Sequence, residues 1–202
     1  MTDAHDHDHD HGHDHEHEHH HEVSYADAVT IFRADKDKFF KGSAGSPIPA
    51  AARDAFTGLP YYPVDERMVV DDLVLGPYTG SQPVEFEFAT SSGKLKPARR
   101  VGMFEFAIDG AACTLTAYRL AGDPSDQLFV PFLDATSGTE TYGAGRYLEL
   151  EAQDDGTWSL DFNLAYHPSC VYGPEFSCPI PPAENRLPVR IEAGERLDSA
   201  HG

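Results

Sequence analysis

Apolar side chains near the start of the chain repeat at helical spacing. They are Val29, Phe32, Phe39 and Phe40. This period predicts a helix over about residues 25–41. Ser24, followed three residues later by Asp27, resembles a capping box, and Gly42 suits a helix end. A second short helix is predicted over residues 49–56, with proline in its first turn.

Farther along the chain, the period changes to two. Residues 84–88 alternate apolar and acidic side chains, which indicates a strand with one wet face. Residues 104–108 and 114–120 read as two strands joined at Asp109-Gly110, a dipeptide favoured in tight hairpins. A second hairpin is predicted from residues 147–152 and 158–164, around a turn at 154–156.

Further strands are predicted at 67–75, 127–133 and 187–192. Seven or eight short strands separated by turns are typical of an all-β architecture. The sequence therefore predicts a mainly β protein, an antiparallel β-barrel or sandwich with an N-terminal α-helix. We expect residues 23–202 to form a single β-rich domain.

Residues 1–22 are of low complexity and lack apolar side chains that could be buried, so we expect them to be disordered. This tail interleaves eight carboxylates with ten imidazoles: His5, His7, His9, His11, His13, His15, His17, His19, His20 and His21. Zn, Ni, Cu and Co all accept imidazole ligands, so the tail is predicted to bind a divalent transition metal. Because metal competes with protons for imidazole, binding should weaken below about pH 6. The alternative reading is an expression tag, although the acids between the histidines favour a natural tail.

The net charge of the chain is −19, and the 26 acids and 15 bases outside the tail contribute −11 of it. Such a surface repels phosphate backbones and anionic lipids, so neither nucleic acid nor membrane is an expected partner. An excess of carboxylates with few lysines suits a halophilic cell, and an acidic mesophilic protein is the equal alternative. No secretory signal or membrane-length apolar run is present, so a cytoplasmic location is expected.

One polar, glycine-containing segment, residues 129–146, separates two predicted strands. Arg146 at its end shares a strand face with Leu148 and Leu150. If the face that carries Asp161 and Asn163 turns inward, these three polar residues form a buried cluster. This cluster is either a binding site or a structural ion pair, since buried charges are usually paired simply to be tolerated.

A cysteine-containing loop follows the second predicted hairpin. Its residues His167, Cys170 and Cys178 suit a zinc site or a Cys–His nucleophile pair in part, but the paired thiolate spacing of structural zinc sites is missing. A proline-stiffened loop that packs over one end of the sheets is the favoured reading.

Several segments together resemble a bacterial and archaeal domain family of unknown function. They include Thr136-Ser137-Gly138, Glu140-Thr141-Tyr142-Gly143, Gly145-Arg146-Tyr147-Leu148, Asp161-Phe162-Asn163, Ala165-Tyr166, Cys178-Pro179, and Glu184-Asn185-Arg186-Leu187-Pro188. The resemblance covers about residues 25–197 and excludes the tail. It implies that these polar positions recur together, which favours a pocket. The family usually has Asn-Pro where this chain has His167-Pro168, which argues against an essential role for His167.

These observations predict a domain that binds, or hydrolyses, a small polar or anionic molecule. Arg146 would clamp an anionic group, and Asp161 or Glu140 would orient or deprotonate the ligand. The ligand-binding candidates are Thr136, Ser137, Glu140, Tyr142, Arg146, Asp161, Asn163, Tyr166 and Asn185. The alternatives are a metal buffer or chaperone in which the domain is a scaffold, and a protein-interaction domain.

Overall fold

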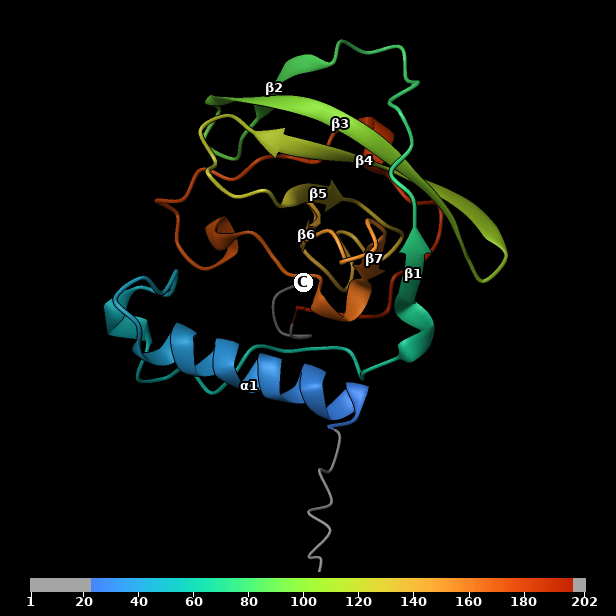
Figure 1. The fold of residues 1–202 in the computed structure, drawn as a ribbon. Coiled ribbons are helices and arrows are strands. Elements are labelled where there is room, and N and C mark those ends of the chain that lie inside the picture. Colours follow the sequence, from blue (N-terminus) through green and yellow to red (C-terminus); the bar gives the residue numbers. More distant parts are fainter. Residues whose placement is uncertain (1–22, 198–202) are drawn as a thin grey trace, which may run out of the picture.

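The strands form two antiparallel sheets beside one α-helix (Figure 1). The structure is a computed structural model that describes residues 23–197. The larger sheet has the order β2-β3-β4-β5-β6 and contains β2 (Glu85–Ala89), β3 (Leu95–Ile108), β4 (Ala111–Leu120), β5 (Leu128–Phe132) and β6 (Arg146–Leu150). The smaller sheet pairs β1 (Val69–Leu73) with β7 (Trp158–Asp161). The predicted fold class is confirmed, as a sandwich rather than a closed barrel.

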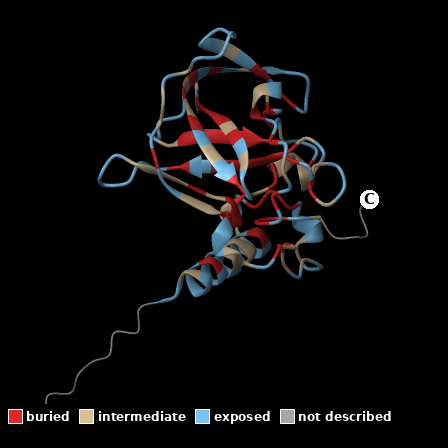
Figure 2. Cartoon of the chain, turned by 90° about the vertical axis from the view of Figure 1, so that its right-hand side faces the viewer, coloured by how far each residue is buried: buried red, intermediate tan, exposed pale blue. Residues whose placement is uncertain are grey.

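The main hydrophobic core lies between the two sheets. The larger sheet contributes Leu115, Val130 and Leu148, and the other side contributes Leu160 and Phe162. All five side chains are buried. Within β5, Leu128, Val130 and Phe132 all belong to this core, so their period-two spacing turns one face of the strand toward it. Figure 2 colours much of the central strands as buried.

A second core covers the opposite face of the larger sheet. Tyr118, Phe129 and Tyr147 project from β4, β5 and β6 and pack against Cys178 in the long loop after β7. The middle of the sheet is therefore buried on both faces. This explains why every residue of β5 is buried.

The helix α1 (Tyr25–Gly42) begins at Ser24 as predicted, since Ser24 Oγ accepts from the Asp27 N–H at 3.1 Å. Val29 and Phe40 are its buried apolar residues. Figure 1 shows α1 beneath the sheets, next to the segments that follow β7. It is tied there by polar contacts: Arg33 donates to the carbonyls of Tyr62 and Asn163 at 2.9 and 3.1 Å.

The first predicted hairpin is confirmed. Asp109 and Gly110 both have positive φ, 48° and 80°, which is the backbone of a tight turn between β3 and β4. Strand β3 starts earlier than predicted, at Leu95, because it also pairs with β2. A register shift between Arg100 and Gly102 lets this long strand serve both partners.

The second predicted hairpin is wrong. The turn forms, with Gln153 N–H donating to the Thr157 carbonyl at 2.9 Å. Beyond it, however, β7 pairs with β1 while β6 pairs with β5. The apolar face of β7 packs onto the core from the opposite side, so the strand must leave the larger sheet.

Two smaller predictions also fail. Residues 187–192 are not a strand, because Ile191 N–H bonds to the Asp134 carboxylate instead of a strand ladder. The predicted helix at 49–56 is reduced to the 3-10 turn Ala50–Ala52. Within residues 23–197, no helix is long and apolar enough to span a membrane.

Candidate functional site

Arg146 is fully buried at the start of β6, on the side of Leu148 and Leu150. Its guanidinium donates to the carbonyls of Ala193, Glu195 and Ile191, the latter two at 3.1 and 2.8 Å. Burial lowers its pKa, and the nearby Asp134 opposes that change. Arg146 therefore fastens the C-terminal segment 191–195 to the sheet and is closed to a ligand.

The carboxylate beside Arg146 is Asp134, with Oδ1 at 3.5 Å from the arginine nitrogen. Asp134 also accepts from Thr136 Oγ1 at 2.8 Å, Ser137 Oγ at 3.2 Å and the Ile191 N–H at 2.8 Å. The candidates Thr136 and Ser137 thus orient a buried carboxylate. The Arg146–Asp134 contact is therefore a structural ion pair, one of the two alternatives considered from the sequence. Its acidic member, Asp134, was not among the predicted site residues.

Asp161 was expected to pair with Arg146, and that expectation is wrong. The face of β7 that turns inward carries Leu160, and Asp161 points to α1 instead. Both Asp161 oxygens accept from Tyr25 Oη at 2.8 Å. Burial, followed by Asp161, raises the pKa of Tyr25, so the phenol stays protonated as the donor.

Asn163 serves as a backbone clamp. Its Oδ1 accepts from the Asp65 N–H at 2.9 Å, and its Nδ2 donates to the Asp65 carbonyl at 2.8 Å. Asn185 does the same in the sheet, bonding Thr116 N–H, Thr116 O and Pro131 O at 2.8 Å each. Both amides are buried and satisfied, so they position backbone.

A buried polar network that was not predicted from the sequence lies between α1 and the sheets, around Glu195. This carboxylate contacts Lys36 Nζ at 2.6 Å, Tyr172 Oη at 2.9 Å and the His167 N–H at 2.7 Å. Lys36 belongs to α1, so the network joins the helix to the sheets. Lys36, His167 and Glu195 are far apart in sequence, and of the network's members only His167 was considered from the sequence.

His167 is held neutral within this network. Burial, followed by the positive charges of Arg146 and Lys36, lowers its pKa to about 3. Its Nε2 accepts from the Tyr142 N–H at 3.2 Å, which leaves the ring proton on Nδ1, 3.6 Å from Glu195. Because its free lone pair is engaged, His167 is a structural residue and cannot accept a substrate proton.

The candidates Asp161 and Tyr166 do share one surface hollow, of about 460 Å³, between α1 and strands β6 and β7. Tyr166 Oη donates to Glu149 at 2.7 Å, and Glu149 and Glu151 also line the hollow. Three carboxylates line this hollow, and none of its lining residues is Lys or Arg. Their negative charge would repel the anionic ligand that was predicted.

A different hollow carries the cations that such a ligand needs. It has a volume of about 590 Å³ and is lined by Tyr62, Pro63, Val64, Asp65, Arg67, Met68, Asp109, Arg190 and Glu192. We call it the Arg67–Arg190 hollow. Two of the predicted candidates support its walls from behind: Asn163 clamps Asp65, and Glu140 binds Arg190 as well as Tyr62 Oη, the latter at 2.9 Å.

Glu140 stays ionised in this position, because Arg190 and then Tyr62 lower its pKa by hydrogen bonding. Arg67 is held by Asp65 through two bonds, Nε to Oδ1 at 3.0 Å and a terminal nitrogen to Oδ2 at 2.6 Å. Both guanidiniums are therefore paired with carboxylates while remaining exposed, Arg67 by 81% and Arg190 by 45% of the side chain.

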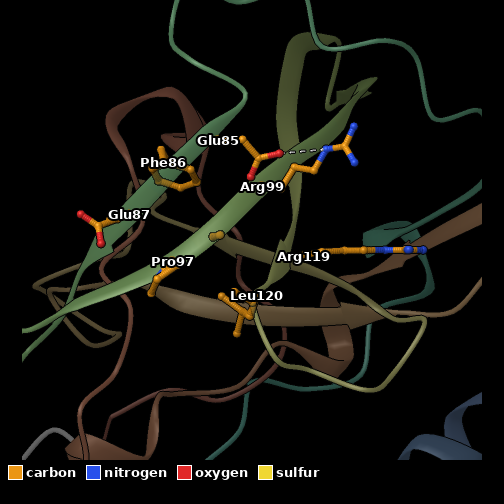
Figure 3. A pocket seen from close by; sticks show the side chains of 9 residues that line it. Glu85, Phe86, Glu87, Pro97, Arg99, Arg119 and Leu120 are labelled. Carbon is orange, nitrogen blue, oxygen red and sulfur yellow. Dashed lines mark ion pairs between the residues drawn. The ribbon is translucent and has the colours of Figure 1, made fainter.

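Figure 3 shows another hollow, of about 480 Å³, at the β2–β3–β4 end of the larger sheet. Arg99 and Arg119 extend from neighbouring strands there, and Glu85 lies 3.5 Å from Arg99. None of the predicted site residues lines or supports this hollow. Its exposed arginines, Arg99 and Arg119, can therefore serve as controls for Arg67 and Arg190.

The predicted metal ligands, His5 to His21, lie outside the described residues. Within residues 23–197 no group of three or more His, Cys, Asp or Glu side chains could hold a metal ion. The cysteines Cys113, Cys170 and Cys178 are free thiols.

Together these features define a β-sandwich domain in which several of the predicted polar residues brace the fold and two of them support the walls of a surface hollow. The chain belongs to the family described as "Protein of unknown function (DUF1684)", whose model matches residues 54–196. It is similar to an uncharacterised protein of Haloarcula marismortui known from a solution NMR structure. The two are 39% identical with a TM-score of 0.63, over 86% of this chain and 95% of the other. No curated protein matches the chain.

Proposed function

We propose that this domain binds a small polar molecule in the Arg67–Arg190 hollow. The observation that carries the proposal is the pair of exposed guanidiniums, each paired with a carboxylate, on the walls of one hollow. A guanidinium offers five N–H donors in a planar fork, and the ion pairs engage only part of them. The remaining donors suit a carboxylate or phosphate group.

The charges of the hollow define the class of ligand further. Two arginines face three acids, Asp65, Asp109 and Glu192. A bare polyanion would be repelled by this balance and by the acidic surface as a whole. A molecule that carries both an anionic group and an ammonium group, such as an amino acid, satisfies both signs.

The rest of the hollow suits a small organic molecule. Pro63, Val64 and Met68 supply apolar surface between the charged groups. The Asn163 clamp on Asp65 and the Glu140 bridge keep the walls in place before a ligand arrives. Preorganised walls lower the entropy cost of binding.

The proposal is tested by NMR titration of the labelled protein with a panel of amino acids, citrate and inorganic phosphate. We expect amino-acid-like ligands to shift the amide signals of residues 62–68 and 190–192. Replacing Arg67 or Arg190 with Gln should weaken binding about 10-fold or more, since a hydrogen bond to a charged group contributes about 1.5–3 kcal/mol. Arg99→Gln is the control, because Arg99 is also exposed and paired with a carboxylate, in another hollow.

Two outcomes contradict the proposal. One is binding that is equally strong in the Arg67 and Arg190 variants. The other is a set of shifted signals that maps to the β2–β3–β4 hollow or to the groove beside Asp161.

We also propose that residues 5–21 bind a divalent transition metal, independently of the hollow. The alternation of ten imidazoles with carboxylates supports this second function. In that case the domain acts as the folded carrier of a metal-buffering tail. Its test is given in the Discussion.

A further inference from the structure

The loop after β7 brings two cysteines together. Cys170 lies in the 3-10 turn Ser169–Val171, and Cys178 follows at the end of the same loop. Two backbone bonds fold the loop back on itself: Gly173 N–H to Ser169 O at 3.1 Å, and Phe176 N–H to Gly173 O at 3.3 Å. Both cysteines pack against the core on this face of the sheet.

The two cysteines are in direct contact, which brings them close enough to approach disulfide geometry. The Cys170 N–H donates to Cys178 Sγ at 3.3 Å. Because Cα is about 1.46 Å from the backbone nitrogen, Cys178 Sγ lies within about 4.8 Å of the Cys170 Cα. The Cα atoms of disulfide-bonded cysteines are usually about 4.4–6.8 Å apart, a range that this contact makes accessible.

The two cysteines differ in anchoring and in exposure. Cys178 is buried and fixed to the edge of the larger sheet, through its N–H to Ser91 Oγ at 3.1 Å and its carbonyl to the Ser91 N–H at 2.9 Å. Cys170 is half-buried and so meets solvent. The third cysteine, Cys113, is buried in the core between the sheets.

We propose that Cys170 and Cys178 are a peroxide-sensitive pair that closes into a reversible disulfide. The Cys170 thiolate attacks hydrogen peroxide, an S–O bond forms, the O–O bond breaks, and hydroxide leaves. The Cys178 sulfur then attacks the resulting sulfenic acid. The S–S bond forms, the S–O bond breaks, and the departing oxygen takes up the thiol proton to leave as water.

The environment of the thiols sets this order. Burial raises the pKa of Cys178 to about 11, so it is a thiol at neutral pH and a poor first nucleophile. The N–H that points at its sulfur stabilises the thiolate that develops when it attacks. The disulfide would link the two ends of the loop. It would form beside Ser169, Phe176 and Pro179, which line a hollow of about 250 Å³.

The experiment is peptide mapping of the full-length protein after treatment with hydrogen peroxide. A chelator is present throughout, so that metal held by the histidine tail does not catalyse oxidation. Cleavage after Glu151, Glu175 and Glu184 places Cys170 in peptide 152–175 and Cys178 in peptide 176–184. We expect the two peptides to be joined in the oxidised sample and to separate on reduction.

Variants assign the roles. Cys178→Ser should stop cross-linking and leave a sulfenic acid at Cys170 that a dimedone-type probe traps. Cys170→Ser should leave Cys178 unlabelled, and Cys113→Ser should still form the cross-link. Peptides that remain separate while Cys170 proceeds to sulfinic acid would overturn the proposal. So would a cross-link that joins two molecules or includes Cys113.

Discussion

The buried guanidinium of Arg146 provides the sharpest test of how this fold is held. Replacing it with Met keeps an unbranched side chain of similar length but removes every donor. Three carbonyls, those of Ile191, Ala193 and Glu195, then lose their partner, and Asp134 loses its cation. The change should mainly affect the attachment of the C-terminal segment to β6.

The magnitude follows from these contacts. Removing one partner of a buried ion pair costs about 3–5 kcal/mol. Each carbonyl left buried without a donor costs about 1–3 kcal/mol, and these terms overlap with the first. Because Asp134 retains other donors, we expect a loss of about 4 kcal/mol, a large part of the roughly 5–15 kcal/mol typical of a folded protein.

Urea unfolding with linear extrapolation measures this loss. Arg99→Met is the matched control, because Arg99 is exposed beside Glu85 and should contribute no more than about 1 kcal/mol. Hydrogen exchange adds a local readout, since the Glu195 N–H bonds to Ala165 O at 2.8 Å and should lose protection in Arg146→Met.

A double-mutant cycle identifies the partner. Adding Asp134→Asn to Arg146→Met should recover about 1–3 kcal/mol, because the stranded charge is removed. Adding Asp161→Asn should be additive, because Asp161 bonds Tyr25. An Arg146→Met variant within about 1 kcal/mol of the parent would refute the reasoning, and so would coupling to Asp161 instead of Asp134.

Three further predictions follow from the network under α1, the sheet and the tail. The folded pKa of His167, about 3, lies below its ordinary value of 6.5, so its contribution to stability is present above pH 6.5 and is lost as the pH falls toward 3. Between pH 6.5 and 3, the free energy of unfolding measured by urea melts should therefore fall less in His167→Asn than in the parent. Parallel pH profiles of the two proteins would contradict this prediction. Asn185→Ala should lower the free energy of unfolding by about 2–4 kcal/mol, because it leaves Thr116 and Pro131 backbone groups unsatisfied, whereas a loss below about 1 kcal/mol would show that water replaces the amide. Calorimetric titration with Ni or Zn should show several sites in the full chain and almost none after deletion of residues 1–22, with unchanged thermal stability on chelation; equal stoichiometry in both forms would be the contrary result.

Much of the fold could be predicted because local signals were strong. The Ser24 cap, the β3–β4 turn at Asp109-Gly110 and the period-two strands each depend on residues close in sequence. The site was predicted less well. Some of its candidates lie around Asp134, around Asp65 and beside Glu149, whereas Asn185 lies in the larger sheet and Tyr142 beside His167. Arg67 and Arg190 gave no signal, because exposed arginines are common in any sequence.

The sequence by itself determined which faces of the strands are apolar, and therefore that Arg146, on the side of Leu148 and Leu150, would be buried. Only the tertiary structure decided what that buried charge meets. Periodicity specifies which face turns inward but not which element packs against it, because that choice depends on contacts between distant residues. β7 thus joined β1 rather than β6, Asp161 turned to Tyr25, and Asp134 became the partner of Arg146.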